Sequence, residues 1–146
     1  MPALFHTGIN GLKSLFKERV TSYNTMPIIL EDVRARFPRL NIIGAHFGFG
    51  YYEEAACLVD SFKEGSKNIH FDISGAAETF RKISEGHWIK KEVPVSTLVW
   101  GLDSQGFEYE RFIGLWTKHF DEIGLTQEDK DRIFFKNACA MFKLEP

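Results

Sequence analysis

Four short segments of the sequence are almost continuously apolar, and each is closed by a polar side chain. They lie at residues 3–6, 40–46, 68–73 and 96–101. Strands buried on both faces of a parallel sheet have this character, whereas strands with one solvated face alternate apolar and polar residues. The pattern therefore predicts four buried parallel strands. The polar residues at or just after their ends are His6, His46, Asp72 and Asp103.

Segments with helical periodicity lie between and after these strands. The predicted helices span residues 27–37, 53–62, 76–83 and 109–123, and a last helix begins near Thr126. Asp129 follows Thr126 by three residues, which is a variant of the capping box. The spacing of the strand ends suits βα units of about 30 residues, with the first unit enlarged by an insert over residues 8–25. This alternation predicts an α/β fold with a parallel sheet and right-handed crossovers.

Composition excludes several classes of partner. The chain has 146 residues, enough for one domain, with 44% hydrophobic residues and a net charge of −2. Because the sequence has no basic stripe, nucleic acid and anionic membranes are not expected as partners. It also has no apolar run of the roughly 20 residues that a membrane span needs. Cys57 and Cys139 are predicted to be reduced, buried thiols, which favours a cytoplasmic location.

The strand-end residues indicate possible metal chemistry. In parallel α/β sheets the carboxyl ends of the strands meet at the ligand-binding edge. His6, His46 and Asp103 would therefore converge there, and two imidazoles with a carboxylate suit a divalent metal such as zinc, manganese or iron. Each residue could instead cap a loop. For Asp72 we favour that structural role, in which its carboxylate bonds nearby backbone donors.

Five segments, taken in order, resemble one known family. Residues 5–8, 37–48, 68–75 and 99–104 resemble the fifth to eighth strands of the amidohydrolase-related family. Residues 133–142, with the pair Asn137-Ala138, resemble its final helix. This family includes aminocarboxymuconate-semialdehyde decarboxylase and metal-dependent hydrolases. The resemblance implies the C-terminal half of a (β/α)8 TIM-type barrel, with strands five to eight and their helices. The resemblance also implies that residues 1–146 are one domain that is truncated at its N-terminus.

The resemblance also implies roles for individual residues. His6 would bind the metal, and His46 would be a second ligand or the base that activates water. Asp103 would bind the metal and accept a proton, so the implied catalytic residues are His46 and Asp103. The implied metal is zinc, with manganese as the alternative. The family's first strand supplies a His-x-His pair, and no such pair occurs in this sequence.

Two functional hypotheses follow. The first is a metal-dependent hydrolase or non-oxidative decarboxylase of a small carboxylated substrate. The second is a non-catalytic half-barrel, or a module that pairs with another copy or with a separate N-terminal half. Four strands of a barrel would leave two apolar edges, near Leu4 and Val99. These edges predict that the chain forms a homo-oligomer, aggregates or stays partly molten. The sequence alone leaves open whether this chain is itself an enzyme.

Overall fold

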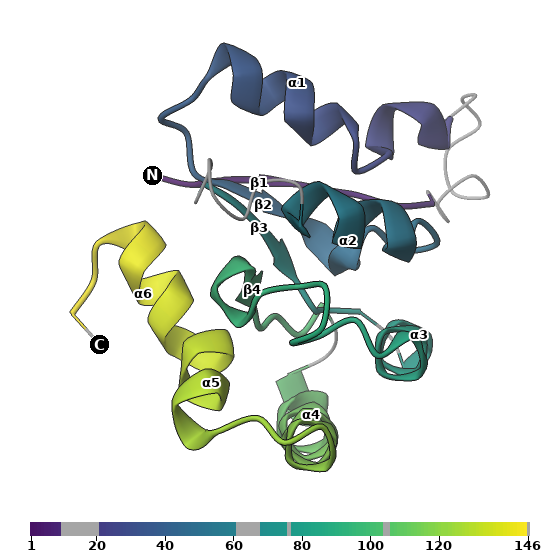
Figure 1. Ribbon diagram of the computed structural model, residues 1–146, viewed down its shortest axis with the longest axis vertical. Coiled ribbons are helices and arrows are strands. Elements are labelled where there is room, and N and C mark those ends of the chain that lie inside the picture. The colour runs from purple at the N-terminus through teal and green to yellow at the C-terminus, as the bar shows by residue number, and fades with distance from the viewer. Residues whose placement is uncertain (10–20, 61–67, 76, 104–105, 146) are drawn as a thin grey trace.

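The computed structural model describes residues 1–9, 21–60, 68–75, 77–103 and 106–145, so parts of the expected insert and of the second predicted helix lie outside the described residues. The fold is α/β (Figure 1). The strands are β1 (Ala3–Phe5), β2 (Ile42–Gly44), β3 (Ile69–Asp72) and β4 (Leu98–Val99). The helices are α1 (Ile29–Arg36), α2 (Tyr52–Asp60), α3 (Ala77–Gly86), α4 (Tyr109–Glu122), α5 (Gln127–Asp131) and α6 (Asn137–Phe142). Short 3-10 turns are η2 (Ser22–Thr25), η3 (Ala45–Phe47), η4 (Val95–Thr97) and η5 (Gly106–Glu108).

The four strands form one parallel sheet in the order β1-β2-β3-β4. Leu4 pairs with Ile43, which pairs in turn with His70. Since side chains at paired positions of a parallel sheet lie on the same face, these three form one row. The α/β class and the four parallel strands predicted from the sequence are confirmed.

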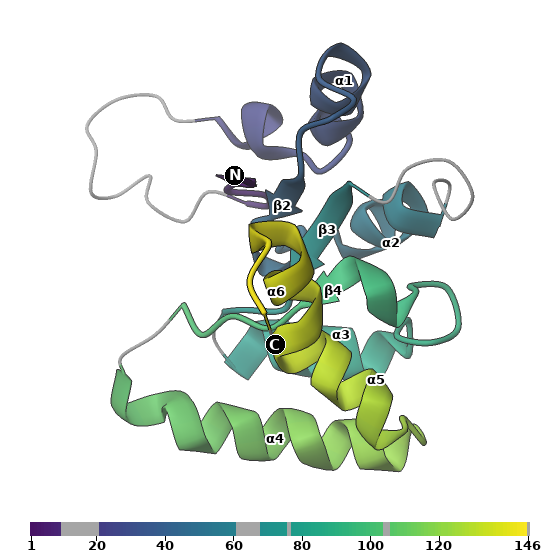
Figure 2. The same ribbon diagram turned by 90° about the vertical axis from the view of Figure 1, so that its left-hand side faces the viewer.

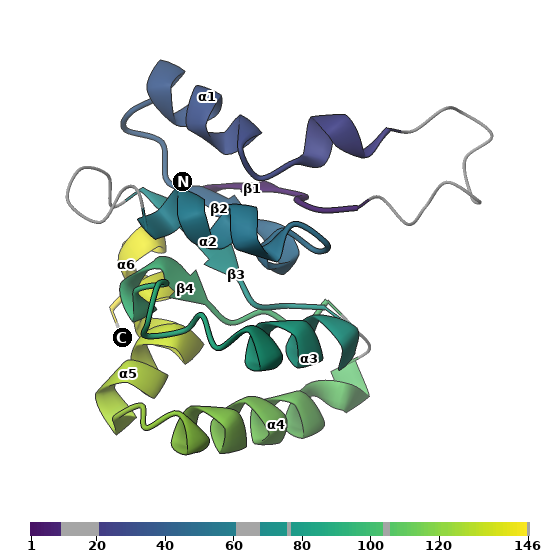
Figure 3. The same ribbon diagram turned by 45° about the vertical axis from the view of Figure 1, so that its right-hand side comes forward.

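One face of the sheet carries the main core. Alternate positions on β2, β3 and β4 are fully buried there and pack against apolar residues of α1, α2, α3 and α4. In Figure 3 these four helices follow one another down the molecule along one side of the strands. The core residues of the strands are Ile42, Ile69, Phe71 and Leu98, and those of the helices include Leu30, Leu58, Val59, Ile83, Trp116 and Phe120.

The opposite face is covered unevenly. Ile43 and Val99 pack there against Met141 and Ala138 of α6, and Figure 2 shows α6 in front of the strands, on the side away from α2 and α3. Leu4 lies on the same face at β1, where its side chain is 66% exposed. The cover therefore extends over β2 and β4 but leaves the β1 end of this face open.

The helix boundaries follow the sequence signals closely. Helix α4 spans Tyr109–Glu122 against a predicted 109–123, and Gly124 after it has the positive φ of 70° that a helix C-cap favours. Thr126 and Asp129 form the predicted capping box at the start of α5. Both cysteines are free, but Cys57 is exposed on α2 and Cys139 is half-buried, so their predicted burial was wrong. None of the described helices is both long and apolar enough to cross a membrane.

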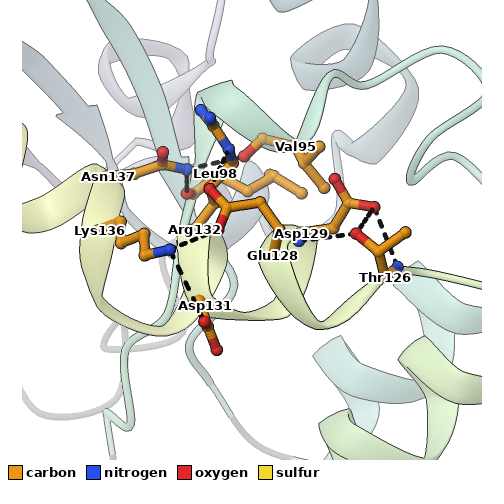
Figure 4. Close-up of polar contacts among 9 residues, drawn as sticks. All are labelled: Val95, Leu98, Thr126, Glu128, Asp129, Asp131, Arg132, Lys136 and Asn137. Carbon is orange, nitrogen blue, oxygen red and sulfur yellow. Dashed lines mark hydrogen bonds and ion pairs between the residues drawn. The ribbon is translucent and has the colours of Figure 1, made fainter.

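A π-helix between α5 and α6, labelled η6 (Arg132–Lys136), attaches the end of the chain to β4. The side-chain amide of Asn137 donates to the carbonyls of Val95 and Leu98 at 2.8 and 2.7 Å, and Figure 4 shows these bonds converging on one nitrogen. The backbone N–H of Trp100 donates to the backbone carbonyl of Ile133 at 2.8 Å. The edge near Val99, predicted to be exposed, is therefore covered by this segment, and Val99 itself is buried.

Candidate functional site

The carboxyl ends of the strands bring together the side chains predicted for a metal site. His6 directly follows β1, and His46 lies in the turn η3 after β2. Their ring centroids are 5.2 Å apart at an interplanar angle of 62°. Asp103 follows β4, and its Oδ2 lies 3.5 Å from Nδ1 of His46. The three residues form one cluster at the end of the sheet where the carboxyl ends of the strands lie.

Backbone strain is concentrated in this cluster. His46, Phe47 and Asp103 have φ values of 61°, 47° and 47°, in the left-handed region that residues with a Cβ adopt infrequently. Such a conformation costs on the order of 1–3 kcal/mol and persists only where surrounding contacts hold it. The contacts that hold these positions are therefore part of the site.

The turn that presents His46 is held by Thr7, a residue that sequence reasoning did not single out. Thr7 is 1% exposed and follows His6 directly. Its hydroxyl donates to the carbonyl of Ala45 at 2.5 Å and accepts from the N–H of Gly48 at 3.2 Å. These two bonds bracket His46, so the residue after one predicted ligand fixes the loop of the other.

Asp72 has the structural role that the sequence favours. Its Oδ1 accepts from the backbone N–H of His46 at 2.8 Å and from the backbone N–H of Ser74 at 3.0 Å. The hydroxyl of Ser74 also donates to this oxygen. Ser74 in turn lies 2.9 Å from Nδ1 of His46. Sequence reasoning missed Ser74; its position two residues after a strand-end carboxylate was the available signal.

The electrostatic environment favours a neutral imidazole at His6. Partial desolvation by the surrounding protein lowers the pKa of His6 below its ordinary value. The nearby His46 lowers it further, whereas the carboxylate of Asp103 acts in the opposite direction. The neutral ring is the form that binds a metal ion. His6 thus has the protonation state that its predicted role requires at neutral pH.

The cluster suits a divalent metal in composition but not in its present arrangement. Imidazole and carboxylate are donors that zinc and manganese accept. Nevertheless, within the described ranges no three His, Cys, Asp or Glu side chains are placed to hold one metal ion together. Asp103 approaches the same nitrogen of His46 that Ser74 contacts. The side chain of Asp103 is 58% exposed and that of His46 is 16% exposed, so the cluster is open to solvent on the Asp103 side.

Comparison with known proteins identifies the family. The sequence model of the amidohydrolase family matches residues 1–144. The chain therefore belongs to the amidohydrolase family, and the resemblance inferred from its five segments is confirmed. No curated protein matches the chain.

A solved structure shares the fold. It is a protein from Lactobacillus casei ATCC 334 described as a "putative metal-dependent hydrolase", with a TM-score of 0.70 and 18% sequence identity. The match covers 98% of this chain and 39% of the other chain. The chain thus spans about two fifths of the length of the protein it resembles. At this level of identity the likeness shows the fold.

Proposed function

We propose that this chain carries part of a divalent-metal site, and that the complete site hydrolyses, or decarboxylates without oxidation, a small carboxylated substrate. The observation that carries the proposal is the cluster of His6, His46 and Asp103 at the carboxyl ends of parallel strands, in a chain of the amidohydrolase family. Such families place their reactive groups at this end of the strands.

Each residue has a role in the proposal. His6 is a metal ligand through its neutral imidazole, and Asp103 is a ligand that also accepts a proton. His46 is either a second ligand or the base that takes a proton from water. When bound, zinc would lower the pKa of its bound water to about 7, and manganese in its place would lower it less. Because the three donors do not converge on one point as they stand, we expect the chain alone to bind metal weakly.

A second candidate is a non-catalytic half-barrel that pairs with another copy or with a separate N-terminal half. We propose that residues 1–146 form a single domain corresponding to strands five to eight of a (β/α)8 barrel. The partial coverage of the L. casei protein supports this, as does the exposed Leu4 on β1. The two unpaired cysteines suit a reducing compartment, so a cytoplasmic location is also proposed.

Calorimetric titration of the chain with zinc and with manganese tests the metal site. We expect weak binding of one ion, and at least about tenfold weaker binding in His6→Ala, because that substitution removes one of three donors. The matched control is His87→Asn. This histidine is exposed and has a φ of 53°, which asparagine tolerates. Its removal leaves the affinity unchanged.

Equal zinc affinity in the wild-type chain and in His6→Ala would remove the metal site from the proposal. Tight binding that survives both substitutions would mean that other residues hold the ion. If metal binds as expected and no small carboxylated compound is turned over, the second candidate gains support, since the chain then retains the ligands without the activity.

A further inference from the structure

We propose that Ser74 and Asp72 hold His46 in the tautomer that carries its proton on Nδ1, which leaves Nε2 as the nitrogen with a free lone pair. Ser74 and Asp72 are positioning residues in this proposal because they act through His46. The inference rests on the proposed function only for the use made of Nε2. The tautomer itself follows from hydrogen bonds within the chain.

One carboxylate oxygen of Asp72 accepts three hydrogen bonds. A carboxylate can only accept hydrogen bonds, so every partner of its oxygens must donate. The backbone N–H groups of His46 and Ser74 both donate to Oδ1, at 2.8 and 3.0 Å. The hydroxyl of Ser74 lies 2.5 Å from the same oxygen, so its proton must point at Asp72.

The hydroxyl of Ser74, like that of any serine, carries a single proton. Once that proton is donated to Asp72, the Ser74 oxygen has only lone pairs left to offer. Nδ1 of His46 lies 2.9 Å from this oxygen. A hydrogen bond across that distance therefore requires Nδ1 to be the donor. Ser74 is 4% exposed, which limits the access of water that could take its place.

Asp103 favours the same tautomer. Its Oδ2 lies 3.5 Å from Nδ1 of His46, on the protonated side of the ring, where a negative oxygen stabilises an N–H group. In a histidine, the partner of one ring nitrogen decides which state the other takes. Ser74 and Asp103 both interact with His46 at Nδ1, so Nε2 is left to bind a metal or to accept a proton.

The arrangement also explains why the three donors do not converge. Nδ1 and Nε2 point away from each other on the imidazole ring. Asp103 lies beside Nδ1. The carboxylate of Asp103 and the free Nε2 of His46 are therefore on different sides of the imidazole ring. In this arrangement His46 acts through Nε2 and Asp103 steadies the other nitrogen. The two would share one ion only after Asp103 turned away from His46.

The backbone and the ring of His46 depend on the same carboxylate. Asp72 holds the strained main chain directly through the N–H of His46, and it holds the ring through Ser74. The segment that follows β4 also packs against this pair. A Cβ added at Gly101 would lie 3.1 Å from Cβ of Ser74 and 3.6 Å from Cγ of Asp72. Ser74 and Asp72 are therefore held in place by packing as well as by hydrogen bonds.

Nitrogen NMR of the chain labelled with ¹⁵N-histidine tests the tautomer directly. Spectra are recorded at mildly alkaline pH without metal, and the His46 signals are identified by their loss in His46→Gln. We expect Nδ1 at the upfield position of a protonated nitrogen and Nε2 at the downfield position of a bare one. Solid-state spectra give the same shifts if the chain associates. A wild-type His46 protonated on Nε2 would overturn the proposal.

Variants of Ser74 supply the second test. Ser74→Ala removes the acceptor, so the His46 signals should shift toward the Nε2-protonated form that free imidazoles prefer. Ser74→Thr keeps the hydroxyl and should restore the wild-type pattern. Ser84→Ala, which removes a hydroxyl bonded to the carbonyl of Arg81, should change nothing. An unchanged tautomer in folded Ser74→Ala would contradict the inference. If Ser74→Ala does not fold, the wild-type spectrum alone decides.

The outcome of this experiment does not depend on whether the proposed function is correct. It uses no metal and no substrate, so a negative zinc titration leaves the tautomer result standing. Conversely, an Nε2-protonated His46 would remove the positioning role while His6 and Asp103 remained candidate ligands. With the expected tautomer, zinc affinity in Ser74→Ala should fall relative to Ser74→Thr only if His46 is a ligand, which separates its two proposed roles.

Discussion

His70 is a buried imidazole on β3 whose Nδ1 has no hydrogen-bond partner among the described residues. Its side chain is 8% exposed and lies in the row with Leu4 and Ile43. Burial lowers the pKa of His70 to about 4. The unfolded chain, with an ordinary pKa near 6.5, then binds a proton that the folded chain does not, so stability is lost as pH falls from about 6.5 towards 4.

We therefore expect the free energy of unfolding to fall by about 3 kcal/mol across that window because of His70. His70→Phe, which keeps a ring and cannot titrate, should remove most of this dependence. Urea denaturation at several pH values measures it. His87→Asn is the control, since its imidazole is exposed. A pH profile that is the same in His70→Phe and in the wild type would show that His70 finds a partner in solution.

Single residues differed in how well the sequence predicted them. The convergence of His6, His46 and Asp103 could be predicted because a strand-end position is visible in the sequence and parallel strands bring such ends together. Ser74 could not, because its role depends on which of its neighbours takes its one proton. His119 lies in the last turn of α4, where a cation would suit the helix dipole. The structure buries it, and that burial lowers its pKa.

At the scale of elements, Asn137 links α6 to the strand that precedes Asp103. Asn137 is 8% exposed, and its amide group donates to two carbonyls at the start of β4 and in the turn before it. Asn137→Ala would leave buried acceptors without a donor, which costs about 1–3 kcal/mol. We expect a loss of that size in urea denaturation, together with faster amide hydrogen exchange at Trp100.

Gln127→Ala is the matched control for this prediction. Gln127 also donates from a side-chain amide, to Asp131 at 2.7 Å, but the bond lies on the surface. Its loss should change stability by less than about 0.5 kcal/mol. Similar effects of the two substitutions would mean that burial around Asn137 does not isolate its acceptors from water.

Elements with strong local signals were predicted well. The end of α1 before Pro38 and the capping box at Thr126 are set by neighbouring residues, so the sequence contains them. The π-helix Arg132–Lys136 was not predicted. Its wider turn leaves the carbonyl of Ile133 available to the N–H of Trp100. That contact joins residues far apart in the chain, and no local periodicity reports it.

At the scale of the whole molecule, the sheet has one open edge where two were expected. Among the described residues, β1 pairs only with β2, whereas the β4 edge is covered by η6 and Asn137. Leu4 on β1 is 66% exposed, on the part of the face that α6 does not cover. Strand edges of this kind pair with other chains unless a charge or a proline prevents it.

We accordingly expect the chain, expressed alone, to associate through β1. Leu4→Lys should shift it towards the monomer, because a charge at an open edge disfavours pairing and an exposed side chain costs little stability when it is changed. Sedimentation velocity and light scattering over a concentration series measure the shift. Phe107→Lys is the control: Phe107 is 85% exposed in the turn η5, which is not part of the sheet, so losing this aromatic should leave association unchanged. If both substitutions disperse the chain equally, association depends on general surface hydrophobicity and not on the β1 edge.

A wild-type chain that is a monomer with well-dispersed amide shifts would contradict the prediction. The four-stranded sheet would then be closed by its own residues. The proposed pairing of a half-barrel with a second copy or an N-terminal half would have no surface to use.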